Sequence, residues 1–353
     1  MQSLRWHGRG DLRLEAVPEP PDPLPGQAVV RVSYCGVCGT DLHEYSHGPN
    51  LIRTGPHPLT GQAPPLTLGP EISGTVAALG SEVPGIEVGT RVAVDPCLRC
   101  GVCRWCTRGE YHICAKGGSV GLASDGGFAS LVTVPAAGLV PVPDGVSDQH
   151  AALAEPLAVG LHAVRRAGVQ PGDSVLVLGA GPIGIALLLF AKLAGAAELF
   201  VSEPVQARAE QARSLGTTEV FDPTSTDVRR EVFLRTGRVG PDVVLEATGR
   251  GDAAQLGIST VRRGGVAVLA GVSSADLQIP LGQIVYFERQ VLGSLGYNFD
   301  IPRVLALMAE QRLDVAPFLT GVATLDNGLD AFRSLESNRG EHLKVLLELE
   351  GSS

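Results

Sequence analysis

The pattern of apolar and polar residues changes in character near residue 150. Before this point, short runs with strand character, such as Ala28 to Ser33 and Val88 to Asp95, are separated by glycine or proline at nearly every gap. This punctuation predicts an all-β, barrel-like domain over residues 1–150.

After residue 150, apolar stretches of strand length alternate with stretches of helix length. Ser174 to Leu178 predicts a buried strand, Ile183 to Ala194 a buried helix, and Leu199 to Ser202 the next strand. Later strands are predicted at Asp242 to Glu246 and Val266 to Ala270. Strand–helix alternation is typical of a parallel sheet with helices on its faces, so an α/β domain follows the all-β one.

The α/β domain is predicted to cover residues 151–291, and residues 292–353 form a further segment. This segment predicts a helix at Pro302 to Gln311 and a last apolar strand at Leu343 to Leu349. A chain of 353 residues is long enough for two domains.

A glycine-rich element joins the first predicted strand of the α/β domain to its helix. It follows the G-x-G-x-x-G pattern, and its residues are Gly179, Gly181, Pro182, Ile183 and Gly184. The glycines permit a tight turn and a close approach of the backbone to a pyrophosphate, which then faces the amino end of the helix. Pro182 suits the first helical turn, where no backbone hydrogen bond is lost. The context predicts a dinucleotide-binding turn.

An acidic residue, Glu203, stands at the end of the next predicted strand. A carboxylate at this place accepts hydrogen bonds from the adenosine ribose and repels a 2′-phosphate. The sequence therefore favours NAD over NADP as the cofactor. The alternative is a solvated glutamate beside a glycine turn that has only a structural purpose.

Five of the seven cysteines lie between Cys97 and Cys114. Four of them have the spacing C-x2-C-x2-C-x7-C, and these are Cys100, Cys103, Cys106 and Cys114. Four thiolates in so short a segment can close a tetrahedral zinc shell with no position left for water, which indicates a structural zinc site. The segment has few apolar residues, so a metal would supply the folding energy that burial cannot. Cys97 is left over.

The charge and the apolar runs exclude several classes of partner. The net charge is -9 and the pI about 5.4, and an acidic surface makes nucleic acid a poor partner. Residues 1–7 lack the apolar run of a secretory signal, and the longest apolar stretch, Ile185 to Ala191, is too short to span a bilayer. We expect a cytoplasmic protein with no membrane partner and with reduced cysteines.

The order of these motifs resembles the zinc-dependent medium-chain alcohol dehydrogenases along essentially the whole chain. The similar stretches are CGVCGTDLH at 35–43, the cysteine lobe at 97–114, EPL at 155–157 and the glycine turn at 179–184. DLHEY at 41–45 and an insert with PHPLTG at 56–61 are most similar to the 2,3-butanediol dehydrogenase branch. The resemblance implies a GroES-like β-barrel domain, completed by residues 292–353, and a Rossmann domain. It also implies a small-molecule substrate and a homodimer or homotetramer.

The resemblance also implies roles for individual residues. Cys38 is similar to the thiolate ligand of a catalytic zinc ion, and Glu155 to a carboxylate ligand. Thr40 is similar to the hydroxyl that takes the substrate proton, and His43 to the outer end of the proton relay, reached through a cofactor ribose hydroxyl. In such a site the metal polarises the alcohol oxygen while the hydroxyl removes its proton. The alternative for Thr40 and His43 is a polar turn without a chemical role.

The sequence departs from this pattern at Pro70. The family has Gly-His-Glu, in which the histidine binds the catalytic zinc, whereas this chain has Gly69-Pro70-Glu71 in an otherwise intact frame. Proline cannot ligate a metal, and a catalytic zinc site normally has three protein ligands beside its water.

Three alternatives for the metal stay open at this point. Cys38, Glu71 and Glu155 could together supply three ligands, with Glu71 swinging inward. An imidazole from the insert, that of His47 or His57, could complete the site instead. In the third alternative the site is metal-free. The loss of an imidazole should lower the affinity for zinc.

Three functions compete. The first, which we predict, is an NAD-dependent dehydrogenase that interconverts a secondary alcohol or vicinal diol with its ketone, as in butanediol and acetoin. The second is a zinc-independent reductase of an activated double bond or carbonyl, with Thr40, His43 or Tyr45 donating the proton. The third is a non-catalytic dinucleotide-binding protein. Intact relay residues favour the two enzymes, and Pro70 shifts weight from the first to the second.

Overall fold

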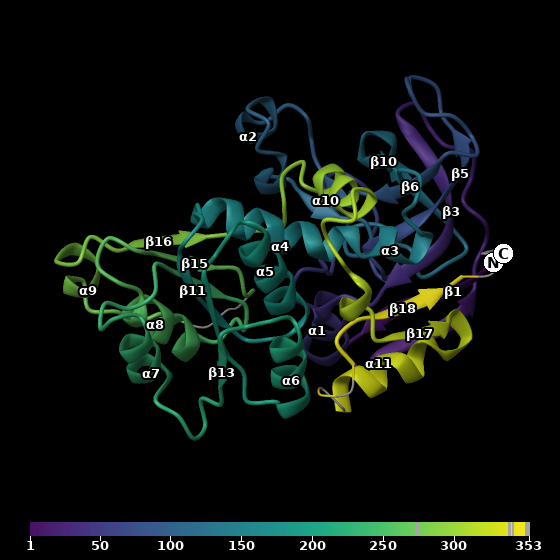
Figure 1. Ribbon diagram of the computed structural model, residues 1–353. Coiled ribbons are helices and arrows are strands. Elements are labelled where there is room, and N and C mark those ends of the chain that lie inside the picture. Colours follow the sequence, from purple (N-terminus) through teal and green to yellow (C-terminus); the bar gives the residue numbers. More distant parts are fainter. Residues whose placement is uncertain (273–275, 338–339, 341, 350–353) are drawn as a thin grey trace. The chain divides into compact units, whose positions relative to one another are not determined.

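The computed structural model describes residues 1–272, 276–337, 340 and 342–349, and it divides into two compact units (Figure 1). Unit 1 comprises Met1–Glu155 together with the chain from Ile301 onward, and unit 2 comprises Pro156–Asp300. The sequence places the corresponding boundaries at 150/151 and 291/292, and that division into domains stays a prediction.

Unit 1 is built from mostly antiparallel strands, in keeping with the punctuated strands of the sequence. Its central strand β3 (Gln27–Gly36) pairs with β5 (Glu71–Leu79), β9 (Leu131–Pro135) and β18 (Val345–Glu348). The strand expected from Val88 begins only at β6, because Gly89 has a φ of 91° and belongs to a turn. The remaining strands are β1 (Gln2–Gly8), β2 (Asp11–Ala16), β4 (Leu66–Thr67), β6 (Arg91–Val94), β7 (Cys97–Leu98), β8 (Gly118–Ser119), β10 (Leu139–Pro141) and β17 (Gly321–Thr324).

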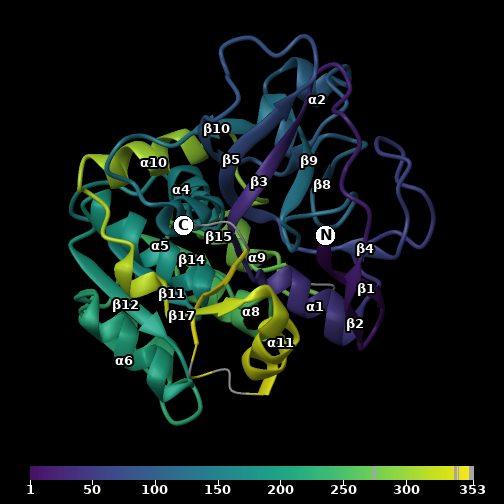
Figure 2. The same cartoon turned by 90° about the vertical axis from the view of Figure 1, so that its right-hand side faces the viewer.

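The returning segment completes the core of unit 1. Phe332 is fully buried and packs edge-on against the rings of Phe128 and Tyr45, with centroids 5.9 Å and 6.0 Å away. It lies on α11, which Figure 2 shows beside β17 and α1. The helices of this unit are α1 (Gly39–His47), α2 (Arg104–Thr107), α3 (Asp148–Ala152), α10 (Ile301–Ala309) and α11 (Gly328–Ser337), with 3-10 turns at Tyr111–Ile113, Ala136–Gly138, Ala316–Phe318 and Leu325–Asn327.

Unit 2 contains the parallel sheet that the strand–helix alternation predicts. Its strands are β11 (Ser174–Leu178), β12 (Glu198–Ser202), β13 (Glu219–Phe221), β14 (Val243–Glu246), β15 (Val266–Leu269) and β16 (Gln290–Gly293). Its helices are α5 (Pro182–Leu193), α6 (Gln206–Ser214), α7 (Val228–Arg235), α8 (Gly251–Thr260) and α9 (Gly282–Val285), and α4 (Ala154–Ala167) leads into it. Figure 1 shows α5 and α6 on one face of the sheet and α7 and α8 on the other.

The order of the strands creates a binding place in unit 2. Within the described residues the strands run β13-β12-β11-β14-β15-β16, all parallel. Every residue of β11 is buried, as a strand covered on both faces requires. The chain order reverses between β11 and β14, so the turns that leave the carboxyl ends of these strands diverge. Such a switch point is where α/β sheets bind their ligands.

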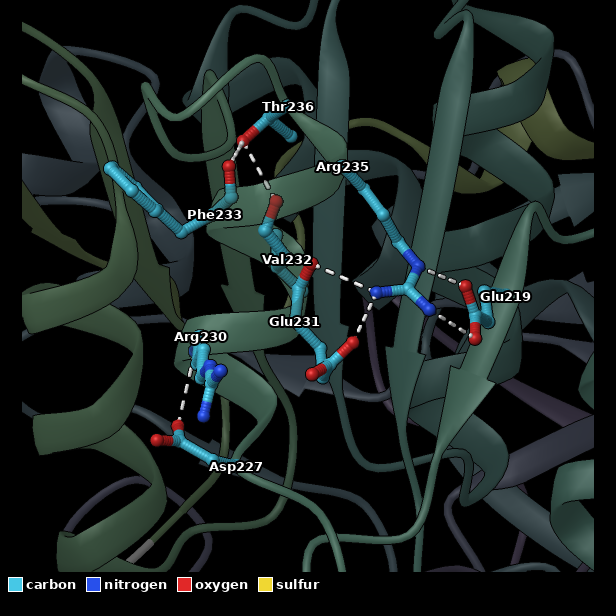
Figure 3. A network of polar contacts seen from close by, with 8 residues as sticks. All are labelled: Glu219, Asp227, Arg230, Glu231, Val232, Phe233, Arg235 and Thr236. Atoms are coloured by element: carbon cyan, nitrogen blue, oxygen red, sulfur yellow. Dashed lines mark hydrogen bonds and ion pairs between the residues drawn. The ribbon is translucent and has the colours of Figure 1, made fainter.

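The edge strand β13 of this sheet is held by an ion-pair network (Figure 3). Both carboxylate oxygens of Glu219, the first residue of β13, accept hydrogen bonds from the Arg235 guanidinium. Arg235 ends α7 and also pairs with Glu231 one turn earlier. The network fastens α7 to the edge of the sheet, two strands away from the switch point between β11 and β14.

Membrane crossing by a helix is not supported by the described part of the chain. None of the helices there is both long enough and apolar enough to pass through a bilayer.

Candidate active site

The four cysteines of the predicted structural site lie together in unit 1. Their ligand atoms are all within 4.8 Å of one another, and in the described residues no other group of three or more histidine, cysteine or acidic side chains meets this condition. The Sγ atom of Cys114 lies 3.6 Å from that of Cys100 and 3.8 Å from that of Cys103. Backbone N–H groups of Cys106 and Ala115 lower the pKa of Cys103 to about 6, which favours the thiolate. The arrangement fits a zinc ion held by four thiolates.

The segment that carries these cysteines has little packing of its own. Its helix α2 has no buried residue. One anchor is Tyr111, whose hydroxyl donates to Asp95 Oδ2 at 2.6 Å and whose ring lies 4.2 Å below the Arg99 guanidinium. Cys97 stands outside the ligand group, and its backbone N–H donates to Asp95 Oδ1. Metal ligation is therefore the main source of stability that the lobe has available.

The proposed relay residues lie at the start of α1. Cys38 precedes the helix, its Sγ accepts a hydrogen bond from the Thr40 N–H at 3.5 Å, and its own N–H donates to Asp41 Oδ2 at 3.0 Å. This reciprocal capping fixes the first helical turn. His43 is exposed, and its ring stacks on that of His47 with centroids 5.2 Å apart. The structure thus sets the Cys38 thiol against the backbone of Thr40 and places the His43 imidazole one turn further, at the surface.

Glu71 opens β5, and its side chain takes part in a buried ion pair. Its Oε1 atom accepts a hydrogen bond from Lys344 Nζ at 2.5 Å, and the same ammonium group donates to the carbonyl oxygen of Val37 at 3.0 Å. Glu71 is completely buried and Lys344 is 2% exposed. The Lys344 ammonium group, just before β18, is therefore bonded both to the backbone just before Cys38 and to the first residue of β5.

Sequence reasoning missed Lys344, although a signal was present. This lysine lies inside the apolar stretch Leu343 to Leu349, which predicts a buried strand. A lysine is almost never fully buried without a partner, so a lone lysine in such a stretch indicates a buried acid elsewhere in the chain.

Lys344→Met is expected to destabilise the protein by about 3–5 kcal/mol, because it leaves the Glu71 carboxylate buried without its cation. Denaturant unfolding measures the change. The double variant Lys344→Met/Glu71→Gln removes the stranded charge and should recover most of the stability. Unfolding of the single variant at the wild-type midpoint would show that this pair does not stabilise the fold.

The Cys38 thiol lies among these charges. Burial raises its pKa, and the negative charges of Glu71, Asp41 and Glu155 raise it further, whereas the Lys344 ammonium lowers it. Glu155 is half-buried in the first turn of α4. Without a metal the thiol therefore stays protonated at neutral pH. Cys38, Glu71 and Glu155 do not form a group with ligand atoms within 4.8 Å of one another in the described structure.

The surroundings of Pro70 contain carboxylate oxygens that lack a donor. Asp41 is completely buried and its Oδ1 atom has no hydrogen-bond partner, and the same is true of Glu71 Oε2. Burial raises the pKa of Asp41 to about 8, although the backbone N–H groups of Cys38 and Gly69 act in the opposite direction. Pro70 is buried and offers no ligand atom. As they are placed, these residues do not fit a catalytic zinc site with three ligands, and the metal role of Cys38, Glu71 and Glu155 stays a prediction.

The histidines of the insert contact other parts of unit 1. His57 is buried, and its ring nitrogens lie 3.3 Å from the N–H of Leu59 and 3.4 Å from the carbonyl oxygen of Gly117. His47 is exposed on α1. Neither belongs to a ligand group with Cys38 in the described residues.

The glycine turn follows β11 as predicted. Gly179 has a φ of 91°, and a Cβ atom there would lie 2.7 Å from the Thr248 methyl group. A Cβ atom at Gly184 would lie 1.9 Å from the carbonyl oxygen of Gly179. At Gly181 the nearest side chain is that of Arg208, whose Nη1 atom lies 3.8 Å from the Cβ position. The turn and the amino end of α5 are thus shaped to accept a phosphate group.

Glu203 follows β12 and contacts this turn. Its Oε2 atom accepts a hydrogen bond from the Ala180 N–H at 2.7 Å, and its Oε1 atom accepts one from the Val205 N–H at 2.8 Å. Pro182 and Ile183 form the first turn of α5, as expected. The carboxylate keeps free lone pairs for ribose hydroxyls while it braces the backbone of the turn.

The chain matches two family models. The alcohol dehydrogenase GroES-like domain matches residues 24–144, and the zinc-binding dehydrogenase model matches residues 182–310. The (R,R)-butanediol dehydrogenase of Bacillus subtilis strain 168 is 37% identical over 98% of this chain and 99% of its own length. The chain belongs to the zinc-binding medium-chain alcohol dehydrogenase family.

Solved structures of the family agree with this assignment. The crystal structure of 2R,3R-butanediol dehydrogenase from Bacillus subtilis has a TM-score of 0.92 at 36% identity and covers 98% of this chain and 99% of that one. A structure from Escherichia coli CFT073, described as a short chain alcohol dehydrogenase complexed with NADH, has a TM-score of 0.90 at 26% identity with 99% of both chains covered. The predicted family, the GroES-like and Rossmann folds and the dehydrogenase activity on a small molecule are thereby confirmed.

Proposed function

We propose that this dehydrogenase uses NAD to interconvert a secondary alcohol or vicinal diol of butanediol type with the corresponding ketone. The observation that carries the proposal is full-length similarity to a butanediol dehydrogenase at 37% identity. The placement of Cys38, Thr40 and His43 at the start of one helix supports it further.

The residues of α1 suit the proton transfer. Oxidation of the alcohol releases a hydride from carbon and a proton from oxygen, and bound NAD supplies the acceptor for the hydride. Thr40 is half-buried in the first turn, and its hydroxyl accepts the proton of the substrate hydroxyl while it donates its own proton toward His43. His43 lies three residues further on the same helical face and is exposed, so it passes a proton to water.

Zinc enters the proposal only at the cysteine lobe. Cys100, Cys103, Cys106 and Cys114 would hold a structural ion that stabilises the fold. The residues around Cys38 do not present three converging ligands, so no step of the reaction is assigned to a metal there.

The proposed preference for NAD rests on Glu203. This carboxylate is 5% exposed and lies against the glycine turn, where it would repel a 2′-phosphate. Arg208 lies beside the same turn and could pair with such a phosphate once the carboxylate is gone. The balance between these two charges is therefore expected to decide the cofactor.

Steady-state turnover of butanediol and acetoin with NAD and with NADP tests the function. We expect kcat/KM to favour NAD at least about tenfold, which corresponds to about 1.4 kcal/mol of repulsion. Glu203→Ala should abolish most of that preference, whereas Glu198→Ala, at the other end of β12, should leave it unchanged. Faster turnover with NADP would refute the cofactor assignment. Turnover of an enone alone would favour the reductase, and cofactor binding without any turnover the non-catalytic protein.

We further propose that the chain forms a homodimer or homotetramer in the cytoplasm. In unit 2, β16 is one of the two edge strands of the sheet, and the preceding segment exposes Leu281, Val285 and Tyr286 by 73%, 57% and 83%. Apolar side chains beside an open sheet edge support pairing with a second copy. A reducing cytoplasm suits the seven cysteines, none of which forms a disulfide in the structure.

A further inference from the structure

A second carboxylate, that of Glu246, lies at the switch point of unit 2. It ends β14 and pairs across the sheet with Leu178, the last residue of β11. The side chain is 1% exposed, and no lysine, arginine or histidine of the described residues forms an ion pair with it. A buried carboxylate without a cation is costly, so its hydrogen bonds must stabilise it where it stands.

Among the described residues, the donors to the Glu246 carboxylate belong to the turn that follows it. Its Oε1 atom accepts hydrogen bonds from the N–H of Thr248 at 2.6 Å, from the Thr248 hydroxyl at 2.5 Å and from the N–H of Gly249 at 2.9 Å. The Ala247 N–H donates to the carbonyl oxygen of Leu178, which ties the same turn to β11. Charge-assisted bonds of this kind define one conformation of the turn.

This conformation places Thr248 against the dinucleotide turn. A Cβ atom at Gly179 would lie 2.7 Å from the Thr248 methyl carbon, so the glycine at this position is required by Thr248 as well as by a phosphate. On the other side, a Cβ atom at Gly271 would lie 2.1 Å from the nitrogen of Gly249 and 2.8 Å from Glu246 Oε2. The turn is therefore enclosed between Gly179 and Gly271, with no room to relax.

We propose that Glu246 is a positioning residue for the dinucleotide. By holding the turn at 247–249, it sets the Thr248 methyl group against Gly179 and thereby fixes the glycine turn from the side opposite to Glu203. This inference rests on the proposed use of NAD, since it assigns a residue to the same binding place. Glu246 makes no contact with the reacting atoms in this assignment.

Direct titration of NAD with the whole protein, followed by fluorescence, tests the inference. Glu246→Leu removes the acceptor and should raise the Kd for NAD about tenfold or more, as expected for the loss of hydrogen bonds to a charged group. Glu246→Gln keeps an oxygen at the same place and should bind NAD within about threefold of wild type. We expect the KM for the alcohol to stay unchanged in both variants, because the turn at 247–249 is packed against the dinucleotide turn at Gly179.

Two further variants distinguish an effect on the position of the dinucleotide turn from an effect on the stability of the fold. Thr248→Ser keeps the hydroxyl but removes the methyl group at Gly179, and it should weaken NAD binding while leaving the melting temperature near that of wild type. Glu219→Leu breaks the ion pair on the edge strand β13, two strands away from β11 (Figure 3), so it should lower the melting temperature without weakening NAD binding.

The outcomes are distinct. Wild-type affinity in both Glu246→Leu and Thr248→Ser would overturn the inference, and so would wild-type affinity in Thr248→Ser if Glu246→Leu did not fold. Failure of the wild-type protein to bind NAD would overturn the proposed function instead, and this is seen before any variant is made.

Discussion

Pro70→His is expected to increase the zinc content from one ion to two per chain and to increase the rate of diol oxidation. The substitution supplies the neutral nitrogen ligand that suits zinc beside the Cys38 thiolate. It also adds a ring N–H at the position next to Glu71, whose buried Oε2 atom has no hydrogen-bond partner. A histidine that ligates zinc usually donates its other ring N–H to such a carboxylate.

The expected gain in zinc affinity is large. Outer partners of metal ligands are themselves worth about 10–100-fold in affinity, so a missing ligand should matter at least as much. Zinc binding should also convert the Cys38 thiol, whose pKa burial raises, into a thiolate, with release of a proton. Elemental analysis of protein purified without chelator measures the stoichiometry, and turnover of butanediol and acetoin measures the reaction.

The matched control for this substitution is Pro70→Ala, which removes the proline ring without adding a ligand. It should keep one zinc per chain and the wild-type rate. Two zinc ions per chain and rapid diol turnover in the wild-type protein would show that Cys38, Glu71 and Glu155 suffice without the imidazole. Additional zinc without any diol turnover in Pro70→His would favour the zinc-independent reductase.

Cys100→Ser is expected to prevent folding of the soluble protein. The cysteine lobe buries few side chains, so zinc ligation provides most of its stability. Structural zinc contributes about 10–16 kcal/mol in zinc-finger peptides, whereas a whole domain is stable by only about 5–15 kcal/mol. Losing one of four ligands should therefore leave a lobe that cannot close, with insoluble protein as the result.

Cys97→Ser provides the control for this variant. Cys97 precedes the lobe and contributes a backbone hydrogen bond to Asp95, but its sulfur is outside the group of four ligand atoms. This variant should be soluble and keep one zinc ion per chain. Soluble, zinc-free and thermally stable Cys100→Ser protein would show that the lobe folds by side-chain packing alone.

Features that depend on neighbouring residues could be predicted from the sequence. The four lobe cysteines span a short segment, so their spacing alone brings the thiolates together. The strand β11, the glycine turn and the helix α5 are also consecutive, and their residues lie where the pattern placed them. The alternation of strands and helices predicted the parallel sheet for the same reason, because each strand and its return helix form one local unit.

The environment of the predicted catalytic residues was decided by tertiary structure. Lys344 and Glu71 are 273 positions apart and meet only because β18 returns beside β3. A single sequence without this pairing shows Glu71 as an available ligand, whereas the fold occupies one of its oxygens with an ammonium group. The orphaned oxygen of Asp41 is likewise invisible in the sequence, since burial and the absence of a donor are properties of the packed core.

At the switch point, too, some features follow from the sequence and others only from the tertiary structure. The sequence alone determined that Glu246 ends a strand and that Gly179 begins a turn, because both follow from local apolar patterns. Only the tertiary structure decided that these strands are neighbours, that the turn after Glu246 folds back onto its carboxylate, and that Thr248 fills the space above Gly179. Strand order is set by long-range packing between the faces of the sheet, and no local pattern of residues encodes it.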